Sequence, residues 1–241
     1  MLKIKMNKFD IRIIFLFFFT LDVLSENIGQ PGELFPIKVN KGIFTSSNGL
    51  IKIDNSYYKL VPLSFSKQGQ YVMFEDTKIF IQNKDFGESR ITITNNALVN
   101  LSDEDKDRTI RESKIINKAL QTYSKKMKPT FSFISPVDGI ISSRYGKKRF
   151  INNSPRSPHL ALDIAAPEGT KVLSPEDGKV ILIGNFFYSG NYLIIDHGQG
   201  LLSSYSHLSS ISVSEDDILK KGQEIGRVGS TGRVTGPHLH W

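Results

Sequence analysis

The sequence predicts a mainly β protein in which two β domains are joined by a single helix. Short apolar runs that alternate with polar residues fill much of the first half, and a charged helical stretch follows them. Closely spaced strands separated by glycines then continue toward the end of the chain. With 241 residues, of which 39% are hydrophobic and 23% are charged, the chain is large enough for two globular cores.

A basic segment followed by a short apolar run opens the chain. Several lysines and Arg12 precede the apolar residues 13–21, and Asp22 interrupts the run. A membrane-spanning helix needs about 20 apolar residues, so this run is too short and fits a secretory signal peptide over residues 1–25. We therefore expect an exported protein of the periplasm or cell envelope. A membrane tether is the alternative if the signal is not cleaved.

Residues 26–100 are expected to form a β-rich accessory domain. Apolar runs at 49–55, 71–74 and 91–94 contain β-branched and aromatic residues, and turn residues close them. This pattern is typical of a small antiparallel β domain. The region contains no histidine and no cluster of catalytic residue types. Its expected role is structural or regulatory.

A connecting helix is expected over residues 101–128. Ser102 and Asp105 resemble a capping box, acidic residues fill the first turn, and lysines lie at the end before Pro129. Apolar residues from Ile110 to Tyr123 approximate a helical stripe. The domain boundary is therefore expected near residue 128.

Residues 129–241 are expected to form the second β domain. Candidate strands lie at 139–143, 179–183, 192–195 and 201–207, with glycines between them. Glycine at this density between short strands predicts tight hairpins in a compact sheet or barrel.

The absence of cysteine restricts the chemistry of any metal site. Without cysteine there are no disulfides and no thiolate ligands, so a metal would be held by histidines and carboxylates. Such ligands favour zinc in a catalytic role. The formal charge of +7 points to an anionic partner, or serves only to keep the protein soluble. No Lys/Arg cluster is interleaved with aromatic residues, so we expect no nucleic-acid partner.

All five histidines lie near the end of the chain, in a pattern that fits a zinc hydrolase. His159 precedes Asp163 by four positions, and His238 precedes His240 by two. In a strand, both spacings place the two side chains on the same face. Catalytic zinc typically takes three protein ligands and leaves one position for water. Two further histidines would then remain, one to take a proton from the water and one to stabilise an oxyanion.

Two other residues of this region are less clear from the residue pattern. Tyr205, two positions before His207, is a candidate substrate-binding residue whose hydroxyl could reach an oxyanion, and core packing is the alternative. His197, in Asp-His-Gly, is expected to be a turn residue outside the site.

The motifs around these residues resemble the signature of the lysostaphin/LytM family of zinc endopeptidases. The matching segments are His159–Asp163, Tyr205–Leu208 and Gly236–Trp241, with structural motifs such as Ser143–Gly146 and Gly229–Arg233. The resemblance covers about 131–241. It implies a mainly antiparallel β fold with an open cleft and one Zn²⁺ per chain.

The resemblance also implies a role for each site residue. His159, Asp163 and His240 would be the zinc ligands, and His207 and His238 the catalytic histidines that do not bind the metal. The implied reaction is hydrolysis of peptide cross-links in bacterial peptidoglycan, at D-alanyl–diaminopimelate bonds or, alternatively, at glycine bridges. The oligomeric state is left open.

The sequence departs from the family pattern in two places. Ala161 stands where the family usually has glycine, which adds a methyl group but removes no ligand. The chain ends at Trp241, where relatives usually continue with a further strand, so we expect a truncated C-terminal end.

Other readings of the sequence remain. The upstream region resembles β-rich domains that cover the cleft in related exported proteins, so self-inhibition is a hypothesis. One alternative function is a catalytically impaired LytM-like protein that binds the wall or activates another wall hydrolase. A lipoyl-like or carbohydrate-binding β module is a third reading, but it leaves the histidine pattern unexplained.

Overall fold

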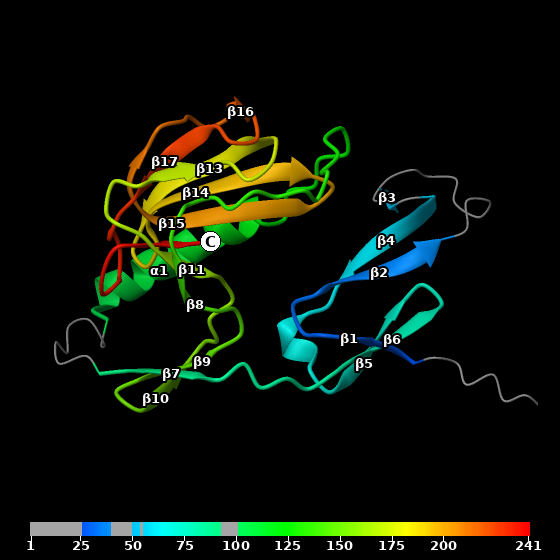
Figure 1. The fold of residues 1–241 in the computed structure, drawn as a ribbon. Helices are drawn as coiled ribbons and strands as arrows, with labels where there is room; N and C mark the ends of the chain where they lie inside the picture. Colours follow the sequence, from blue (N-terminus) through cyan, green and yellow to red (C-terminus); the bar gives the residue numbers. More distant parts are fainter. Residues whose placement is uncertain (1–25, 40–49, 54, 93–100) are drawn as a thin grey trace, which may run out of the picture.

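The computed structural model describes residues 26–39, 50–53, 55–92 and 101–241 (Figure 1). The expected signal peptide, residues 1–25, lies outside the described residues. In the described part of the chain, no helix is long and apolar enough to cross a membrane.

The N-terminal part contains two three-stranded sheets. Their strands, in sheet order, are β1 (Asn27–Gly29), β6 (Thr77–Ile81) and β5 (Gln70–Phe74) in one sheet, and β2 (Leu34–Val39), β4 (Ser56–Pro62) and β3 (Leu50–Ile53) in the other. A 3₁₀ turn at Phe65–Lys67 links β4 to β5. Val61, Leu63, Ile79 and Ile81 form the core of this part. The pairs are antiparallel, as expected, except that β1 runs parallel to β6.

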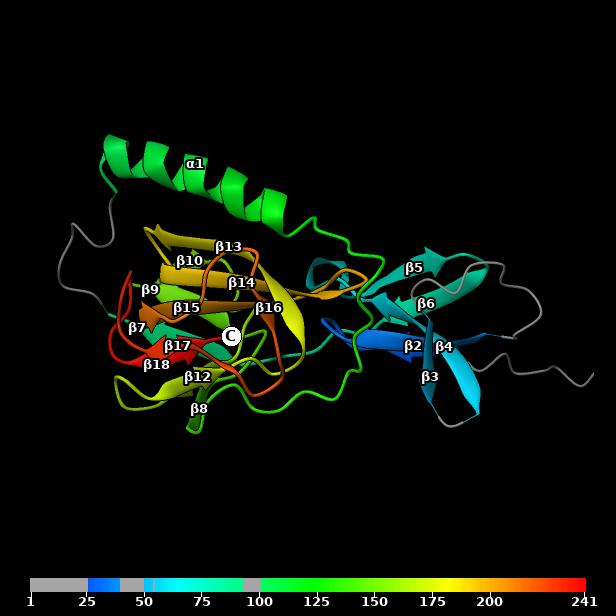
Figure 2. The same cartoon turned by 90° about the horizontal axis from the view of Figure 1, so that it is seen from above.

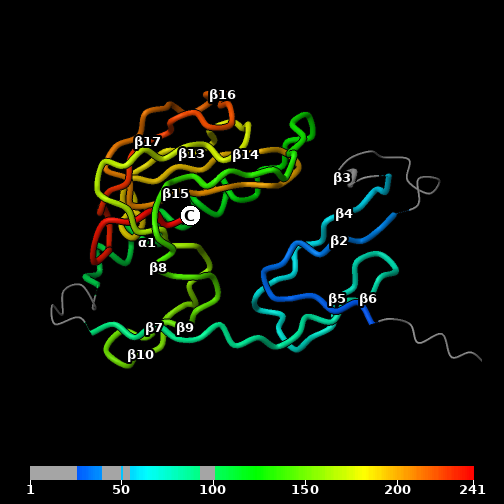
Figure 3. Tube along the Cα trace, in the orientation of Figure 1, coloured from blue at the N-terminus to red at the C-terminus, as the bar shows by residue number. Residues whose placement is uncertain are grey.

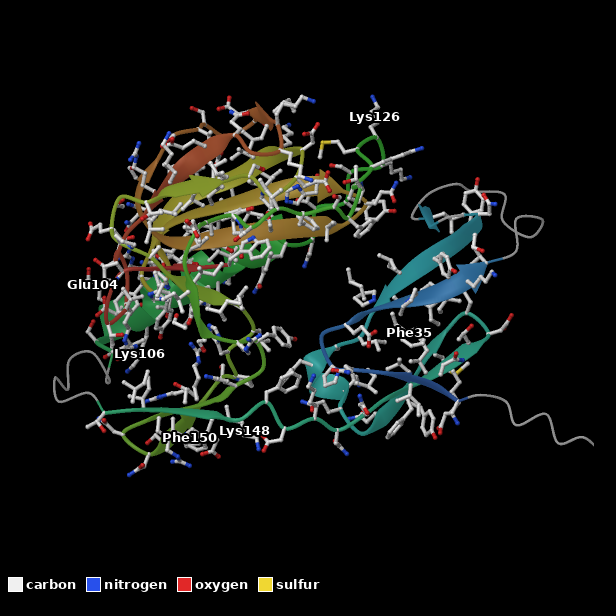
Figure 4. All side chains as sticks on the ribbon, viewed as in Figure 1. Phe35, Glu104, Lys106, Lys126, Lys148 and Phe150 are labelled. Carbon is white, nitrogen blue, oxygen red and sulfur yellow. The ribbon has the colours of Figure 1, made fainter. Side chains whose placement is uncertain are left out.

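The next strand leaves this part of the molecule. β7 (Glu88–Ile91) pairs in parallel with β9 (Lys148–Ile151), which pairs in turn with β10 (Ser154–Arg156). In Figure 3 the chain can be traced from β6 into β7, which lies beside the hairpin formed by β9 and β10. Arg90 on β7 lies over the ring of Phe150 on β9, 4.1 Å from its centroid; Phe150 is labelled in Figure 4. Part of the expected accessory region therefore forms a sheet with the C-terminal half.

The single α-helix of the described residues is α1 (Asp103–Ala119). Its N-cap is Ser102, whose side chain accepts a hydrogen bond from the Asp105 N–H, as the capping pattern predicts. Ile116 and Ala119 pack against the buried cluster formed by Phe186, Tyr192 and Ile194. Figure 2 shows α1 lying along the sheet that carries those residues. The helix thus covers one face of the C-terminal sheet in addition to joining the two halves.

The helix ends earlier than residue 128 because the following segment binds the C-terminal sheet. The Ser124 carbonyl accepts a hydrogen bond from the Gln199 N–H, and Thr130 donates to the buried Glu176 carboxylate. These contacts hold residues 120–130 outside the helix and against the strands.

The C-terminal part is built on one antiparallel nine-stranded sheet. The strands are β8 (Ile140–Ser143), β11 (Asp163–Ala165), β12 (Lys171–Leu173), β13 (Gly178–Phe186), β14 (Gly190–Gly198), β15 (Leu201–Ile211), β16 (Ile218–Leu219), β17 (Glu224–Val228) and β18 (His238–His240). The main path runs β16-β13-β14-β15-β18-β11-β8, and β17 joins β12 to β15. The mainly β fold class is confirmed.

The core of this part lies inside the curved sheet. It includes Val180, Leu193, Tyr205, Leu208 and Leu239, none of which has exposed surface. Short β18 lies between β15 and β11, with hydrogen-bonded partners on both sides. This position brings the last strand into the middle of the sheet and fixes the side chains that it carries.

Candidate metal centre and active site

The register of three strands places the candidate residues together. Asp163 on β11 lies directly opposite His240 on β18, and Ser206 on β15 lies opposite His240 from the other side. Leu239 points into the core and is fully buried, so its neighbours His238 and His240 share the opposite face. The strand expected for the closing His-x-His is present, with the alternation that the spacing predicts.

His159 reaches the same place from a loop. It lies after β10 and before β11, so the expectation that His159 and Asp163 share one strand is wrong. A pair of backbone hydrogen bonds holds it instead: Gly146 N–H donates to the His159 carbonyl at 2.6 Å, and His159 N–H donates to the Lys147 carbonyl at 2.9 Å. Ala161 lies in the bend between His159 and Asp163, and its methyl group is accommodated in a buried position.

Three potential ligand atoms converge at this point. His159 Nε2 lies 3.0 Å from Asp163 Oδ1 and 3.3 Å from His240 Nδ1. Asp163 Oδ1 and His240 Nδ1 are 2.8 Å apart, so the three atoms form a small triangle. Tetrahedral zinc with bonds of about 2.0–2.1 Å separates its ligand atoms by about 3.3 Å. The triangle and its two-histidine, one-carboxylate composition therefore fit zinc closely.

The surroundings orient this triangle for a cation. The outer nitrogen of His159, Nδ1, lies 3.2 Å from the Arg144 carbonyl, which fixes Nδ1 as the donor and turns the Nε2 lone pair inward. Burial raises the pKa of Asp163, but the contacts of its carboxyl group with His159 and His240 outweigh this effect and lower the pKa. The carboxyl group is thus held as a carboxylate.

The other two histidines of the site are oriented in the same manner. His207 Nδ1–H donates to the Thr231 carbonyl at 2.9 Å, and His238 Nδ1–H donates to the Gly236 carbonyl at 2.9 Å. Their ring centroids are 4.9 Å apart, and the His207 ring is 5.6 Å from that of His240. Burial lowers the pKa of His207 to about 4, so its ring is neutral near pH 7. The His207 ring therefore keeps an acceptor Nε2 beside the triangle.

An irregularity in β15 turns His207 toward the site. Tyr205 and Leu208 belong to the same core cluster although they are three residues apart, which a regular strand does not allow. His207 lies between them with a φ of 66°, and the β15 register shifts just beyond it. Such a bulge re-aims a side chain, and a left-handed non-glycine residue is uncommon enough to point to function.

Comparison with known proteins agrees with this geometry. Residues 157–241 match peptidase family M23. A crystal structure from Pseudomonas aeruginosa described as a peptidase M23 matches with a TM-score of 0.67 and 29% identity, over 88% of this chain and 87% of that one. The chain belongs to peptidase family M23. The resemblance to lysostaphin/LytM-type endopeptidases is confirmed at the level of the family, and the C-terminal part has the M23 fold.

Two curated relatives share the C-terminal part of this M23 chain. The peptidoglycan DD-endopeptidase ShyA of Vibrio cholerae is 44% identical over 109 residues, which are 44% of this chain and 25% of ShyA. The DD-carboxypeptidase/endopeptidase Mpg of Neisseria meningitidis is 45% identical over 83 residues, 34% of this chain and 19% of Mpg. This chain therefore spans about a quarter of the length of ShyA and less of Mpg.

Tyr205 occupies the interior of the M23 domain. It has no exposed surface, and its hydroxyl lies 2.8 Å from Ser203 Oγ. Of the two interpretations offered for this residue, core packing describes its position. A buried phenol bonded to Ser203 gives no support to the expected contact with substrate, so Tyr205 is left out of the proposed site.

His197 is an interior strand residue, so its interpretation as a turn residue is wrong. It lies in β14 and is almost fully buried. Nδ1 lies 2.8 Å from the Asp177 carbonyl, and Nε2 lies 2.7 Å from Ser203 Oγ. Through Ser203 it joins Tyr205 in a buried polar network, which the sequence analysis did not predict.

The carbonyl groups that orient the histidines were also not predicted individually. Arg144 and Thr231 act through their backbones, so their side-chain types carry no signal of this role. They nevertheless lie within two segments that the family resemblance singles out as structural motifs, Ser143–Gly146 and Gly229–Arg233. The motifs thus indicated the two segments, and the structure shows that their backbone carbonyls orient His159 and His207.

Proposed function

We propose that this chain is an exported zinc metalloendopeptidase that hydrolyses peptide cross-links of bacterial peptidoglycan. The observation that carries the proposal is the convergence of a His159–Asp163–His240 triangle with two oriented, non-ligand histidines. The names of ShyA and Mpg as DD-endopeptidases support a cross-link between two D-centres, such as D-alanyl–diaminopimelate, over a glycine bridge. The proposed location, the periplasm or cell envelope, follows from this substrate.

His159, Asp163 and His240 would hold the zinc ion. Bound zinc in such a site lowers the pKa of water to near neutrality and polarises a carbonyl oxygen. The fit rests on the ligand types, on the edges of 2.8–3.3 Å, and on the inward-facing lone pair of His159. A crystal structure titled as a zinc-containing peptidase from Vibrio cholerae, 42% identical over 45% of this chain, is in keeping with this choice of metal.

His207 and His238 would carry the protons. Each ring has its Nδ1–H bound to a backbone carbonyl, so Nε2 is the nitrogen available to the reacting groups. A neutral Nε2 can accept the proton of the attacking water, and the protonated ring can then return it to the leaving amine. The second ring donates a hydrogen bond to the oxyanion that develops on the scissile carbonyl, through an Nε2–H whose proton is taken from solvent beforehand and stays on the ring throughout.

Zinc analysis and sacculus digestion of site variants test this proposal. We expect one zinc per chain for residues 26–241, and release of muropeptides that a chelator abolishes. His240→Ala and Asp163→Ala should lose both zinc and activity, because each removes a ligand. His207→Ala and His238→Ala should keep zinc and lose about 10²–10⁴-fold in kcat, because each removes a proton-transfer group.

His197→Asn is the matched control, since it changes a histidine outside the site. It should retain zinc and turnover in the folded fraction. Full activity in His238→Ala would overturn the division of roles within the His-x-His pair. Zinc binding and sacculus binding without any muropeptide release would favour the alternative, a catalytically impaired wall-binding protein or hydrolase activator.

A further inference from the structure

Two loops border the site on the side of His207. The first is the turn between β13 and β14, residues 187–189. Its Ser189 carbonyl accepts a hydrogen bond from the His207 N–H at 2.8 Å. The loop before β18 is closed at its base by a hydrogen bond from His238 N–H to the Gly229 carbonyl, and it supplies the Thr231 carbonyl to His207 Nδ1. Both loops are therefore fixed to the same histidine.

The two loops are also packed tightly against each other. A Cβ atom added to Gly232 would lie 2.4 Å from the backbone nitrogen of Gly190, so no larger residue fits at this crossing. Next to it, Arg233 N–H donates to the Tyr188 carbonyl at 3.1 Å. The backbones beside His207 thus form one fixed wall, on which Tyr188 and Arg233 are adjacent.

The side chains of exposed Tyr188 and half-buried Arg233 form a cationic platform on this wall. The guanidinium carbon lies 5.7 Å from the centroid of the Tyr188 ring, which is 47% exposed. Among the described residues, no carboxylate forms an ion pair with Arg233. Glu112, an acid bound to this turn, is already engaged by the Phe187 N–H and by Arg108. Arg233 therefore offers its donors to an external group.

A guanidinium held on an aromatic ring suits a carboxylate in particular. Its planar donors match the two oxygens of a carboxylate, and contact with the ring reduces the side-chain freedom lost on binding. In a D-alanyl–diaminopimelate cross-link, the carbon that bears the acylated amine also bears a free carboxylate. The proposed substrate thus places an anion next to the scissile amide, near the histidines that this wall supports.

We propose that Arg233, supported by Tyr188, is a specificity-determining residue that binds the substrate carboxylate next to the scissile bond. This inference rests on the proposed function and deepens it. It predicts a preference for peptides whose flanking carboxylate is free over peptides in which the same group is amidated.

Kinetics on two forms of one substrate test the proposal. The probes are a purified cross-linked stem-peptide dimer and the same dimer with its diaminopimelate carboxyl amidated, each digested by the zinc-loaded chain. We expect Arg233→Gln to lower kcat/KM about tenfold or more on the free carboxylate form and to leave the amidated form unchanged. On the free carboxylate form, the kcat/KM of Arg233→Lys should lie between those of the wild type and Arg233→Gln, because lysine keeps the charge but loses the planar donors.

Arg111→Gln supplies the matched control. Arg111 is an exposed arginine on α1, so this variant makes the same change in net charge away from the wall and should leave both substrates unaffected. An equal loss on both substrates in Arg233→Gln would assign Arg233 to loop structure, and no loss on either would remove it from recognition. Either result overturns the proposal.

A binding measurement separates this proposal from the proposed function. In the His238→Ala background, which should hold zinc without turnover, calorimetry gives the Kd of the free carboxylate dimer and of the amidated dimer, with and without Arg233→Gln. We expect Arg233→Gln to weaken binding about tenfold. If the chain binds zinc and discriminates the two dimers but cleaves neither, the proposed function fails and this inference stands. An unchanged Kd, or no binding by either protein, overturns the inference.

Discussion

His197 differs from the other four histidines because both of its ring nitrogens contact groups outside the candidate site. Nδ1 faces the Asp177 carbonyl and Nε2 faces Ser203 Oγ. Burial lowers the pKa of His197, although the Asp177 carbonyl and the nearby Glu176 and Asp196 carboxylates oppose this effect. The neutral ring is therefore the form that the fold prefers, and the unfolded chain binds a proton more readily.

This difference predicts a stability loss in mild acid. Above about pH 6.5, the usual histidine pKa, neither state takes the proton and the full contribution of His197 is present. As the pH falls below 6.5 toward the lowered pKa, the unfolded chain is protonated first, and stability falls by up to about 1.4 kcal/mol per pH unit. Urea denaturation of wild type and His197→Asn at pH 8 and pH 5 measures this effect. The stability gap between the two proteins should narrow at pH 5, and a constant gap would contradict the assignment.

Residue spacing predicted the faces of regular strands but not the irregular backbone around them. His238 and His240 share a face because β18 is a regular strand. His159 meets Asp163 through a bend, and His207 reaches the site through a residue of positive φ. Both depend on backbone hydrogen bonds to distant segments, which leave no periodic signal. The family resemblance supplied the identities of these residues where periodicity could not supply their geometry.

Helix α1 is joined to the wall of the site through the side chains of Glu112 and Arg108, and Arg108 lies 5.8 Å from the centroid of the Phe187 ring. Glu112 accepts a hydrogen bond from the Phe187 N–H at 2.7 Å and pairs with Arg108 at 2.6 Å. Phe187 directly precedes Tyr188, and their rings are in edge contact. The helix therefore holds the β13–β14 turn, in addition to the apolar contacts that Ile116 and Ala119 make with the sheet.

Removing this carboxylate should destabilise the domain through the turn. Glu112→Ala leaves the Phe187 N–H without its acceptor, and we expect a loss of about 1–3 kcal/mol in the free energy of unfolding. Glu104→Ala is the control, because Glu104 is exposed in the first turn of the same helix (Figure 4) and should cost only a few tenths of a kcal/mol. Urea denaturation measures both. Equal losses in the two variants would show that the contact with Phe187 adds nothing.

At the scale of elements, local signals predicted where α1 begins but not where it ends. The Ser102 cap is local and was predicted, whereas the end at Ala119 depends on contacts of Ser124 and Thr130 with the strands. The same limit applies to β7. This strand overlaps the expected run at 91–94 only at Ile91, residues 93–94 lie outside the described residues, and the pattern does not indicate a partner strand. Its parallel pairing with β9 joins residues 60 positions apart, such as Glu88 and Lys148, and only the tertiary fold reveals it.

At the scale of the molecule, the two β-rich parts meet next to a segment that supports the site. Tyr145 contacts the rings of Phe65 and Phe86, at centroid distances of 5.8 and 5.9 Å. Tyr145 lies between Arg144, whose carbonyl orients His159, and Gly146, whose N–H bonds to the His159 carbonyl. The accessory part is therefore in contact with the loop that holds a proposed zinc ligand.

Two deletions separate self-inhibition by the accessory part from simple destabilisation. Removing residues 26–128 also removes α1, which uncovers Phe186, Tyr192 and Ile194. Each buried side chain of this kind contributes about 1.5–3 kcal/mol, so we expect this truncated protein to unfold at a markedly lower temperature. Removing only residues 26–86 keeps β7 and α1 in place and should preserve the C-terminal fold.

If the accessory part restricts access to the site, the protein lacking residues 26–86 should digest sacculi faster than the 26–241 chain. Zinc content must be measured in parallel, because this deletion also removes the aromatic partners of Tyr145. Faster digestion at one zinc per chain supports self-inhibition. Unchanged specific activity at full zinc content would refute it. A loss of zinc would instead show that Phe65 and Phe86 stabilise the loop that positions His159.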